Sequence, residues 1–120
     1  MPSPVVHFEV LGKDAAALQS FYGQAFGWQM QDAMEGSYYM ASTGQENAIA
    51  GGVGAAPEGG QGHVTFYVEV DDLAAYLKKA EELGGQTIVP PTELEQFGLT
   101  FAFFADPEGH VVGLSKGAVQ

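Results

Sequence analysis

Five polar side chains occupy alternate positions of two short segments, and their types could support chemistry. The segments read VVHFEV at 5–10 and HVTFYVEV at 63–70. Both are typical of half-buried strands, in which every second side chain points to the same face. The opposite face carries the Phe and Val residues that should pack under a helix. The polar set comprises His7, Glu9, His63, Thr65 and Tyr67.

These residue types allow three interpretations. Two imidazoles and a carboxylate, from His7, His63 and Glu9, form a chemically adequate set for a divalent metal with open coordination positions. Without a metal, His7 or Glu9 could serve as a general base if its surroundings move its pKa toward neutrality. In the simplest interpretation, His63 only begins a strand, and His7 and Glu9 hydrogen-bond each other.

Aromatic residues on the predicted strands are the second candidate set. Strand alternation lets only some of them line the inside of a sheet, and most should pack in the core. Phe8, Phe21, Phe26 and Phe66 are expected between helix and sheet. Tyr67, Tyr39 and Phe103 are predicted to join the polar set in contacting a flat apolar or cationic ligand.

The elements that must position these residues occur twice in the same order. The strand at 5–10 precedes a helix that Asp14 should cap and Gly27 should end. Three short β-compatible runs follow before Val53. The strand at 63–70 precedes a second helix, with Asp71 or Asp72 as its cap. The stripe of this helix is Leu73, Tyr76, Leu77, Ala80 and Leu83, and Gly84-Gly85 should end it.

A shift of 58 positions aligns the two halves. It places Phe8 on Phe66, Asp14 on Asp72 and Gly27 on Gly85, so strand, cap and helix end coincide. The second half continues with strands at 86–90, 99–105 and 110–115 and a loop at 91–98. The sequence therefore predicts an α+β fold of two tandem βαβββ modules. Module one covers 5–53, a glycine-rich linker covers 54–62, and module two covers 63–116, all within one domain over 1–120.

Each half is too small to bury a good core alone, so the two curved mixed sheets are expected to pair and enclose a pocket. Composition narrows the ligand of that pocket. Four lysines and no arginine stand against fifteen carboxylates, giving a net charge of -11. This balance disfavours nucleic acid, anionic membranes and anionic ligands as partners, and favours a neutral or cationic small molecule.

The chain has no cysteine, which excludes thiolate metal sites and disulfides. The N-terminal segment predicts no signal peptide, so a cytoplasmic location is expected.

Three motifs carry a resemblance to a known family. They are HFEVLGKD followed by FYGQAFGW, then VEVDDLAAYLKKAEELGG, and finally FADPEGHVVGL. Together they resemble the vicinal oxygen chelate superfamily, the group of glyoxalase I, bleomycin resistance proteins and extradiol dioxygenases. The resemblance covers nearly the whole chain. It implies paired βαβββ modules whose U-shaped sheets enclose a pocket, usually in a homodimer.

The resemblance also implies where a metal would be bound. Metal enzymes of this superfamily take ligands from the first strand of each module and a glutamate from a module's last strand. His7 occupies the first of these positions, but Thr65 stands at the equivalent place in module two. Gly113 replaces the expected glutamate, and module one has Gly51 and Gly52 on its last strand. The resemblance therefore predicts a protein without the usual metal triad and with no cofactor. It would bind a small apolar or cationic molecule. The alternative is a lyase, isomerase or dioxygenase using an atypical divalent metal site.

Overall fold

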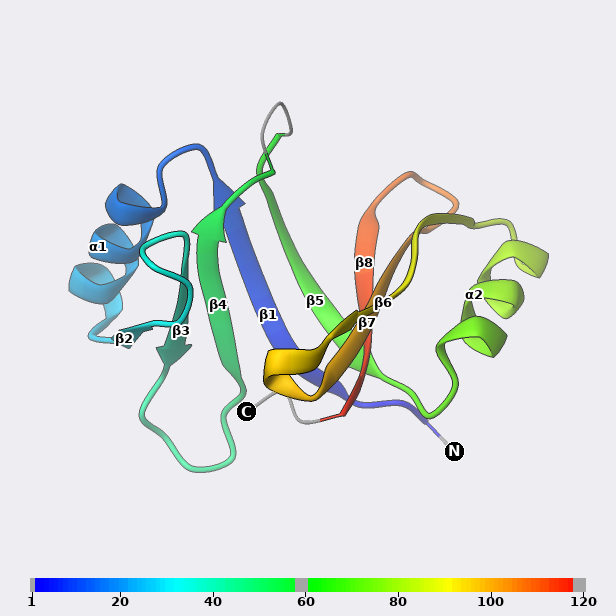
Figure 1. Cartoon of the computed structure of the whole chain (residues 1–120), viewed down its shortest axis with the longest axis horizontal. Coiled ribbons are helices and arrows are strands. Elements are labelled where there is room, and N and C mark those ends of the chain that lie inside the picture. Colours follow the sequence, from blue (N-terminus) through cyan, green and yellow to red (C-terminus); the bar gives the residue numbers. More distant parts are fainter. Residues whose placement is uncertain (1, 58–60, 118–120) are drawn as a thin grey trace. The chain divides into compact units, whose positions relative to one another are not determined.

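A computed structural model describes residues 2–57 and 61–117. The chain divides into an N-terminal unit, His7–Val64, and a C-terminal unit, Met1–Val6 with Thr65–Gln120. Two long helices and eight strands alternate in the predicted βαβββ order, which occurs twice (Figure 1). The predicted α+β fold class is therefore confirmed.

The N-terminal unit contains the first βαβββ set. Its elements are β1 (Val5–Gly12), α1 (Ala15–Phe26), β2 (Gln29–Asp32), β3 (Tyr38–Ser42) and β4 (Ala50–Ala55). The strands follow the order β2-β3-β4-β1. β1 runs parallel to β4, while β3 is antiparallel to both β2 and β4. The last strand of the set thus returns beside the first, and its residues face those of β1 directly.

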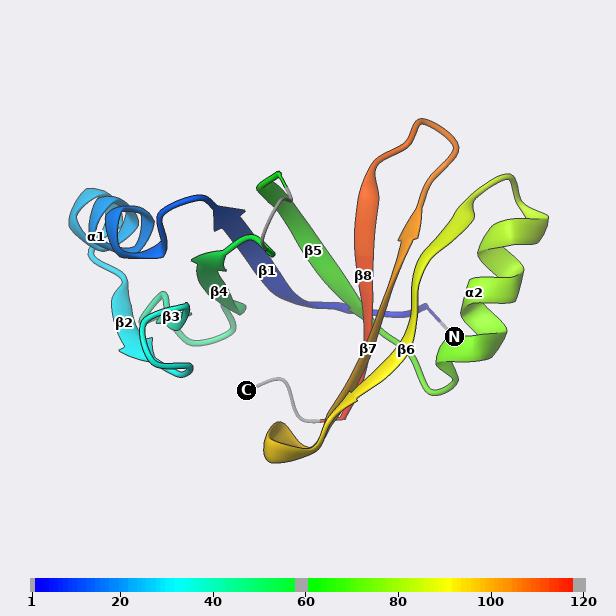
Figure 2. The ribbon, with the colours of Figure 1, turned by 45° about the horizontal axis from the view of Figure 1, so that its top comes forward.

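Helix α1 begins and ends at the predicted residues. The Asp14 carboxylate accepts the Ala17 amide at 3.0 Å, and Gly27 ends the helix in the left-handed region at φ 73°. Leu18 and Tyr22 pack on a core of Val10, Ala41 and Val53. Figure 2 shows the helix beside the short strands of this unit.

Three phenylalanines predicted between helix and sheet are exposed instead, and for these the prediction was wrong. Phe21 and Phe26 are 61% and 63% exposed, because Leu18 and Tyr22 take the stripe of α1 that faces the sheet. Phe66 is 42% exposed because α2 (Leu73–Glu82) packs on β6 (Gln86–Leu94), β7 (Leu99–Ala105) and β8 (Val111–Gly117). Phe8 does pack against the core, as predicted.

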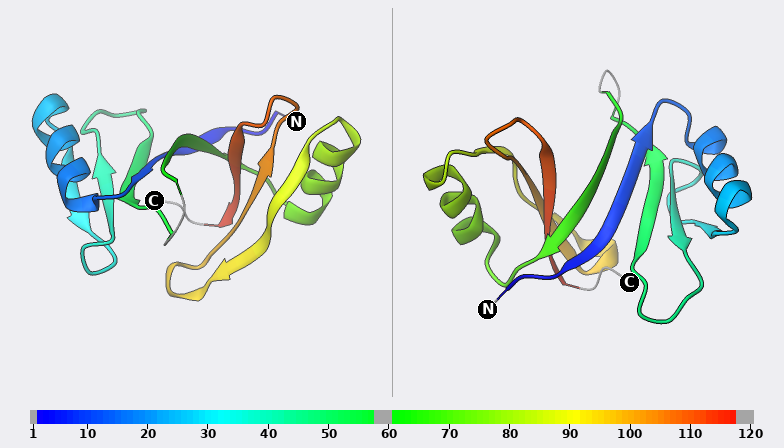
Figure 3. Two further views of the ribbon diagram at one scale, coloured as in Figure 1. Left: turned by 90° about the horizontal axis from the view of Figure 1, so that it is seen from above. Right: turned by 180° about the vertical axis from the view of Figure 1, so that it is seen from behind.

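The C-terminal unit contains the second βαβββ set. Besides α2, its elements are β5 (His63–Glu69), β6 (Gln86–Leu94), the short 3-10 helix η1 (Glu95–Phe97), β7 (Leu99–Ala105) and β8 (Val111–Gly117). The strand order is β5-β8-β7-β6, with β5 parallel to β8 and the other pairs antiparallel. Figure 3 shows α2 beside β6.

Two expectations for this unit need correction. The predicted loop at 91–98 is partly strand, because β6 continues through Pro90 and Pro91 to Leu94 with two register shifts. Proline is tolerated there because β6 is an edge strand. Leu83, predicted on the apolar stripe of α2, follows the last helical residue and is 72% exposed. Leu73 and Leu77 are buried as predicted, with Val70, Ala102 and Leu114.

Strand β4 ends at Ala55, so it extends into the range predicted as a linker, 54–62. Residues 58–60 of that range lie outside the described residues. In the described part of the chain, no helix is long and apolar enough to cross a bilayer.

Candidate functional site

The site begins with the alternation of β1. His7 and Glu9 share one face of this strand and are each 5% exposed, while Val10 on the other face belongs to the core under α1. The register with β4 pairs Glu9 with Gly52 and Val10 with Val53. Two ionisable side chains are therefore buried on the sheet face opposite the helix.

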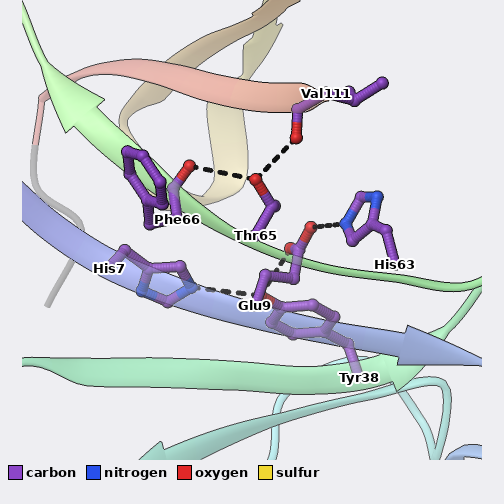
Figure 4. Close-up of polar contacts among 7 residues, drawn as sticks. All are labelled: His7, Glu9, Tyr38, His63, Thr65, Phe66 and Val111. Carbon is purple, nitrogen blue, oxygen red and sulfur yellow. Dashed lines mark hydrogen bonds and ion pairs between the residues drawn. The ribbon is translucent and has the colours of Figure 1, made fainter. Parts of the chain in front are cut away.

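Tyr38 joins these two side chains. Its hydroxyl donates to Glu9 Oε2 at 2.8 Å and lies 3.1 Å from His7 Nε2. Figure 4 shows the tyrosine hydroxyl between the imidazole and the carboxylate. His7 and Glu9 are thus linked through a residue 29 positions further along the chain from Glu9.

His63 extends the same network. Its Nε2 lies 2.8 Å from Glu9 Oε1, and the side chains of His63 and Glu9 are 27% and 7% exposed. The four residues His7, Tyr38, Glu9 and His63, called here the polar cluster, form one continuous hydrogen-bonded chain. All four belong to the N-terminal unit.

Glycines on β4 create the space for the Tyr38 ring. A Cβ atom at Gly52 would overlap the Tyr38 hydroxyl, and one at Gly54 would lie 2.6 Å from Tyr38 Cδ1. A side chain at position 52 would therefore displace the hydroxyl from His7 and Glu9. Gly52 and Gly54 are therefore part of the site, although they contribute no functional group to it.

Burial shapes the electrostatics of the cluster. Desolvation lowers the pKa of His7 below its ordinary value, and the negative charge of Glu9 opposes this shift in part. A neutral imidazole is therefore favoured at position 7. The chain has no arginine, and its four lysines, at positions 13, 78, 79 and 116, are all exposed. Tyr38 and His63, which contact the buried Glu9 carboxylate, carry no permanent charge.

The C-terminal unit carries the other predicted site residues. Thr65 is 8% exposed, and its hydroxyl donates to the Val111 carbonyl at 2.6 Å. Tyr67 is also 8% exposed and packs against Phe103, with ring centroids 5.4 Å apart. A Cβ atom at Gly113 would overlap the Tyr67 ring. This unit therefore presents a mostly aromatic face.

Sequence reasoning selected the wrong tyrosine for the polar cluster. Tyr38 is part of it, whereas Tyr39 pairs in register with Val53 and so lies on the helix-facing side of β3. A signal was present in Gly52 and Gly54 of the neighbouring strand, which leave room for a large ring. The side chain of the third histidine, His110, is 73% exposed and pairs with Asp106.

The residues at the superfamily's metal positions do not fit a metal. The Thr65 hydroxyl is engaged with a backbone carbonyl, and the aromatic rings of Tyr38 and Tyr67 fill the space beside Gly52 and Gly113 where a ligand side chain would start. Within residues 2–57 and 61–117, no three His, Asp or Glu side chains gather closely enough to hold an ion. The alternative set of His7, His63 and Glu9 gains no support from this geometry.

Comparisons with known proteins agree with this architecture. The chain is 36% identical over 107 residues to a protein named "Putative glyoxylase CFP32" in Mycobacterium bovis and in Mycobacterium tuberculosis. The alignment covers 84% of this chain and 41% of that protein, so the chain spans about two fifths of these curated relatives.

Two solved structures share the fold. A glyoxalase/bleomycin resistance protein/dioxygenase superfamily member from Vibrio splendidus 12B01 superposes with a TM-score of 0.67 at 14% identity, covering 96% of this chain and 99% of that one. The Mn(II)-bound glyoxalase from Novosphingobium aromaticivorans gives the same TM-score and identity, covering 93% of this chain and 37% of that one.

A family comparison assigns the chain itself. The match extends over residues 5–114, from the first strand of module one to the last strand of module two. The chain therefore belongs to the Glyoxalase/Bleomycin resistance protein/Dioxygenase superfamily.

Proposed function

We propose that this protein binds a small cationic or neutral molecule, without a metal, on the sheet face that carries the polar cluster. The observation that carries the proposal is the buried carboxylate of Glu9, held by Tyr38 and His63 in a chain without arginine. A buried carboxylate is stabilised by each further hydrogen-bond donor and positive charge that comes close to it. A ligand that supplies a cation and N–H donors would add to the contacts of Glu9.

The chemistry of the carboxylate supports this ligand class. Its two oxygens offer about four acceptor positions, so ligand donors can add to those of Tyr38 and His63. Hydrogen bonds between charged groups in a buried site are about twice as strong as neutral ones. The net charge of -11 also attracts cations and repels anions over the whole surface. The superfamily to which the chain belongs includes bleomycin resistance proteins, so a binding role is compatible with its family.

A matched set of three aromatic probes tests the charge preference. Benzamidine, benzamide and benzoate have nearly the same shape but carry a positive, zero and negative charge. After dialysis against EDTA, thermal shift should show stabilisation by benzamidine, less by benzamide and none by benzoate. Stabilisation by benzoate together with no response to benzamidine would contradict the proposal.

An enzymatic role is the second candidate, and it is favoured by the relatives named as a glyoxylase. It would require a divalent metal held in an atypical way by His7, Glu9 and His63. Calorimetric titration with Mn²⁺ and Zn²⁺ discriminates between the two functions. Stoichiometric binding of either ion, lost in His7→Gln and Glu9→Gln, would favour the enzyme.

A further inference from the structure

The direction of the hydrogen bonds in the polar cluster fixes where its protons lie. The Tyr38 hydroxyl has a single proton, and it is donated to Glu9 Oε2 at 2.8 Å. The same oxygen can then only accept at its other contact, 3.1 Å from His7 Nε2. His7 must therefore carry a proton on Nε2. Where Glu9 Oε1 accepts in its contact with His63, His63 likewise donates through Nε2.

This arrangement depends on where the Tyr38 ring lies. The ring crosses β4 beside Gly52 and Gly54, and a Cβ at either position would overlap or crowd it. The hydroxyl is the group that contacts both β1 side chains, which stand two residues apart on the same face. A phenylalanine at position 38 would keep the ring and remove this link.

We propose that Tyr38 is the positioning residue of this site. Its hydroxyl sets His7 as the Nε2–H tautomer and aligns the Glu9 carboxylate for a cationic ligand. It thereby adds a direct hydrogen-bonded link, without a metal ion, between the side chains of His7 and Glu9. The statement about the ligand rests on the proposed function, whereas the statement about the tautomer does not.

The tautomer is tested by long-range ¹H–¹⁵N NMR of the imidazole rings at neutral pH. The wild-type protein should show His7 protonated on Nε2, and Tyr38→Phe should shift His7 toward a mixture of tautomers. Tyr22→Phe is the matched control, because it removes a hydroxyl from the helix face of the same unit and should leave the His7 spectrum unchanged. Gly52→Ala should reproduce the Tyr38→Phe spectrum, since its Cβ occupies the place of the hydroxyl.

Binding of benzamidine provides the second measurement. Tyr38→Phe should weaken it about tenfold, as expected for losing one hydrogen bond to a charged group, while Tyr22→Phe should not. A wild-type His7 protonated on Nδ1, or an unchanged His7 spectrum in Tyr38→Phe, would overturn the inference. If the spectra behave as expected but no probe binds to the wild type, the proposed function fails and the positioning role stands.

Discussion

The two modules use the same backbone plan to build faces of opposite character. In module one, Glu9 pairs in register with Gly52. Tyr67, 58 residues after Glu9, pairs with Gly113 in module two. Each glycine makes room for a tyrosine ring. The ring beside Gly52 comes from β3 and completes a polar network, whereas the ring beside Gly113 comes from β5 and joins Phe103.

The two modules therefore differ in the chemistry of the sheet face opposite the helix. The module-one face carries the hydrogen-bonded carboxylate of Glu9, and the module-two face carries the rings of Tyr67, Phe101 and Phe103. At both register positions a glycine stands where a larger side chain would overlap a tyrosine ring.

Glu9→Gln should have the largest effect on ligand binding, because it replaces the buried carboxylate that distinguishes module one from module two. We expect the affinity for benzamidine to fall by at least about tenfold, to the level of benzamide, measured by isothermal titration calorimetry. Glu69→Gln is the control, since it neutralises an exposed carboxylate on β5. Equal losses in both variants would mean that net charge, and not the cluster, attracts the cation.

Alanine at Gly52 and at Gly113 allows the two modules to be compared by their effect on the stability of the protein. Gly52→Ala and Gly113→Ala should each lower the free energy of unfolding by about 1–3 kcal/mol, because the new Cβ overlaps a packed ring. Urea denaturation measures this loss. Gly52→Ala alone should also alter the His7 NMR signals. A variant as stable as the wild type would show that its tyrosine ring moves aside without cost.

The pH dependence of stability should trace to module one. Burial lowers the folded-state pKa of His7, so between that pKa and the unfolded value of about 6.5 the unfolded chain binds more protons. The free energy of unfolding is therefore not reduced by His7 above about pH 6.5, and it decreases as the pH falls toward the folded-state pKa. Melting temperatures from pH 5 to 8 should show this slope in the wild type and in His110→Gln, and a weaker slope in His7→Gln. An equal slope in all three proteins would assign the effect elsewhere.

The smallest effect should come from the exposed aromatic residues on α1. Phe21→Ser and Phe26→Ser should change the free energy of unfolding of the isolated chain by no more than about 0.5 kcal/mol, because both side chains are mostly solvated. Leu77→Ala, in the core under α2, should cost about 2–5 kcal/mol by comparison. Sedimentation velocity on the same variants tests the predicted homodimer. A loss of dimer would locate its interface on α1.

Local signals in the sequence were sufficient for the fold. The Asp14 and Asp72 caps and the Gly27 helix end are short-range features, and each was found where it was predicted. Alternation placed His7 with Glu9 on one face of β1 and Thr65 with Tyr67 on one face of β5, and all four side chains are buried.

Alternation did not reveal that Tyr38 is the hydrogen-bond partner of His7 and Glu9. Which tyrosine of the pair at 38 and 39 reaches β1 depends on the register of β3 against β4, and sequence alternation alone does not fix register. The exposure of Phe21 and Phe66 has a similar origin, since it depends on how much of each sheet a helix covers. Both errors concern tertiary contacts, which apolar periodicity does not encode.

The most direct test of the central claim is a calorimetric titration of benzamidine in EDTA, repeated after EDTA is removed and Mn²⁺ is added. If the Tyr38-centred cluster stands in place of a metal, the dissociation constant should be the same in both conditions, and Mn²⁺ alone should give no heat of binding. Binding of benzamidine only in the presence of Mn²⁺, or stoichiometric uptake of Mn²⁺ by the protein, would contradict the claim.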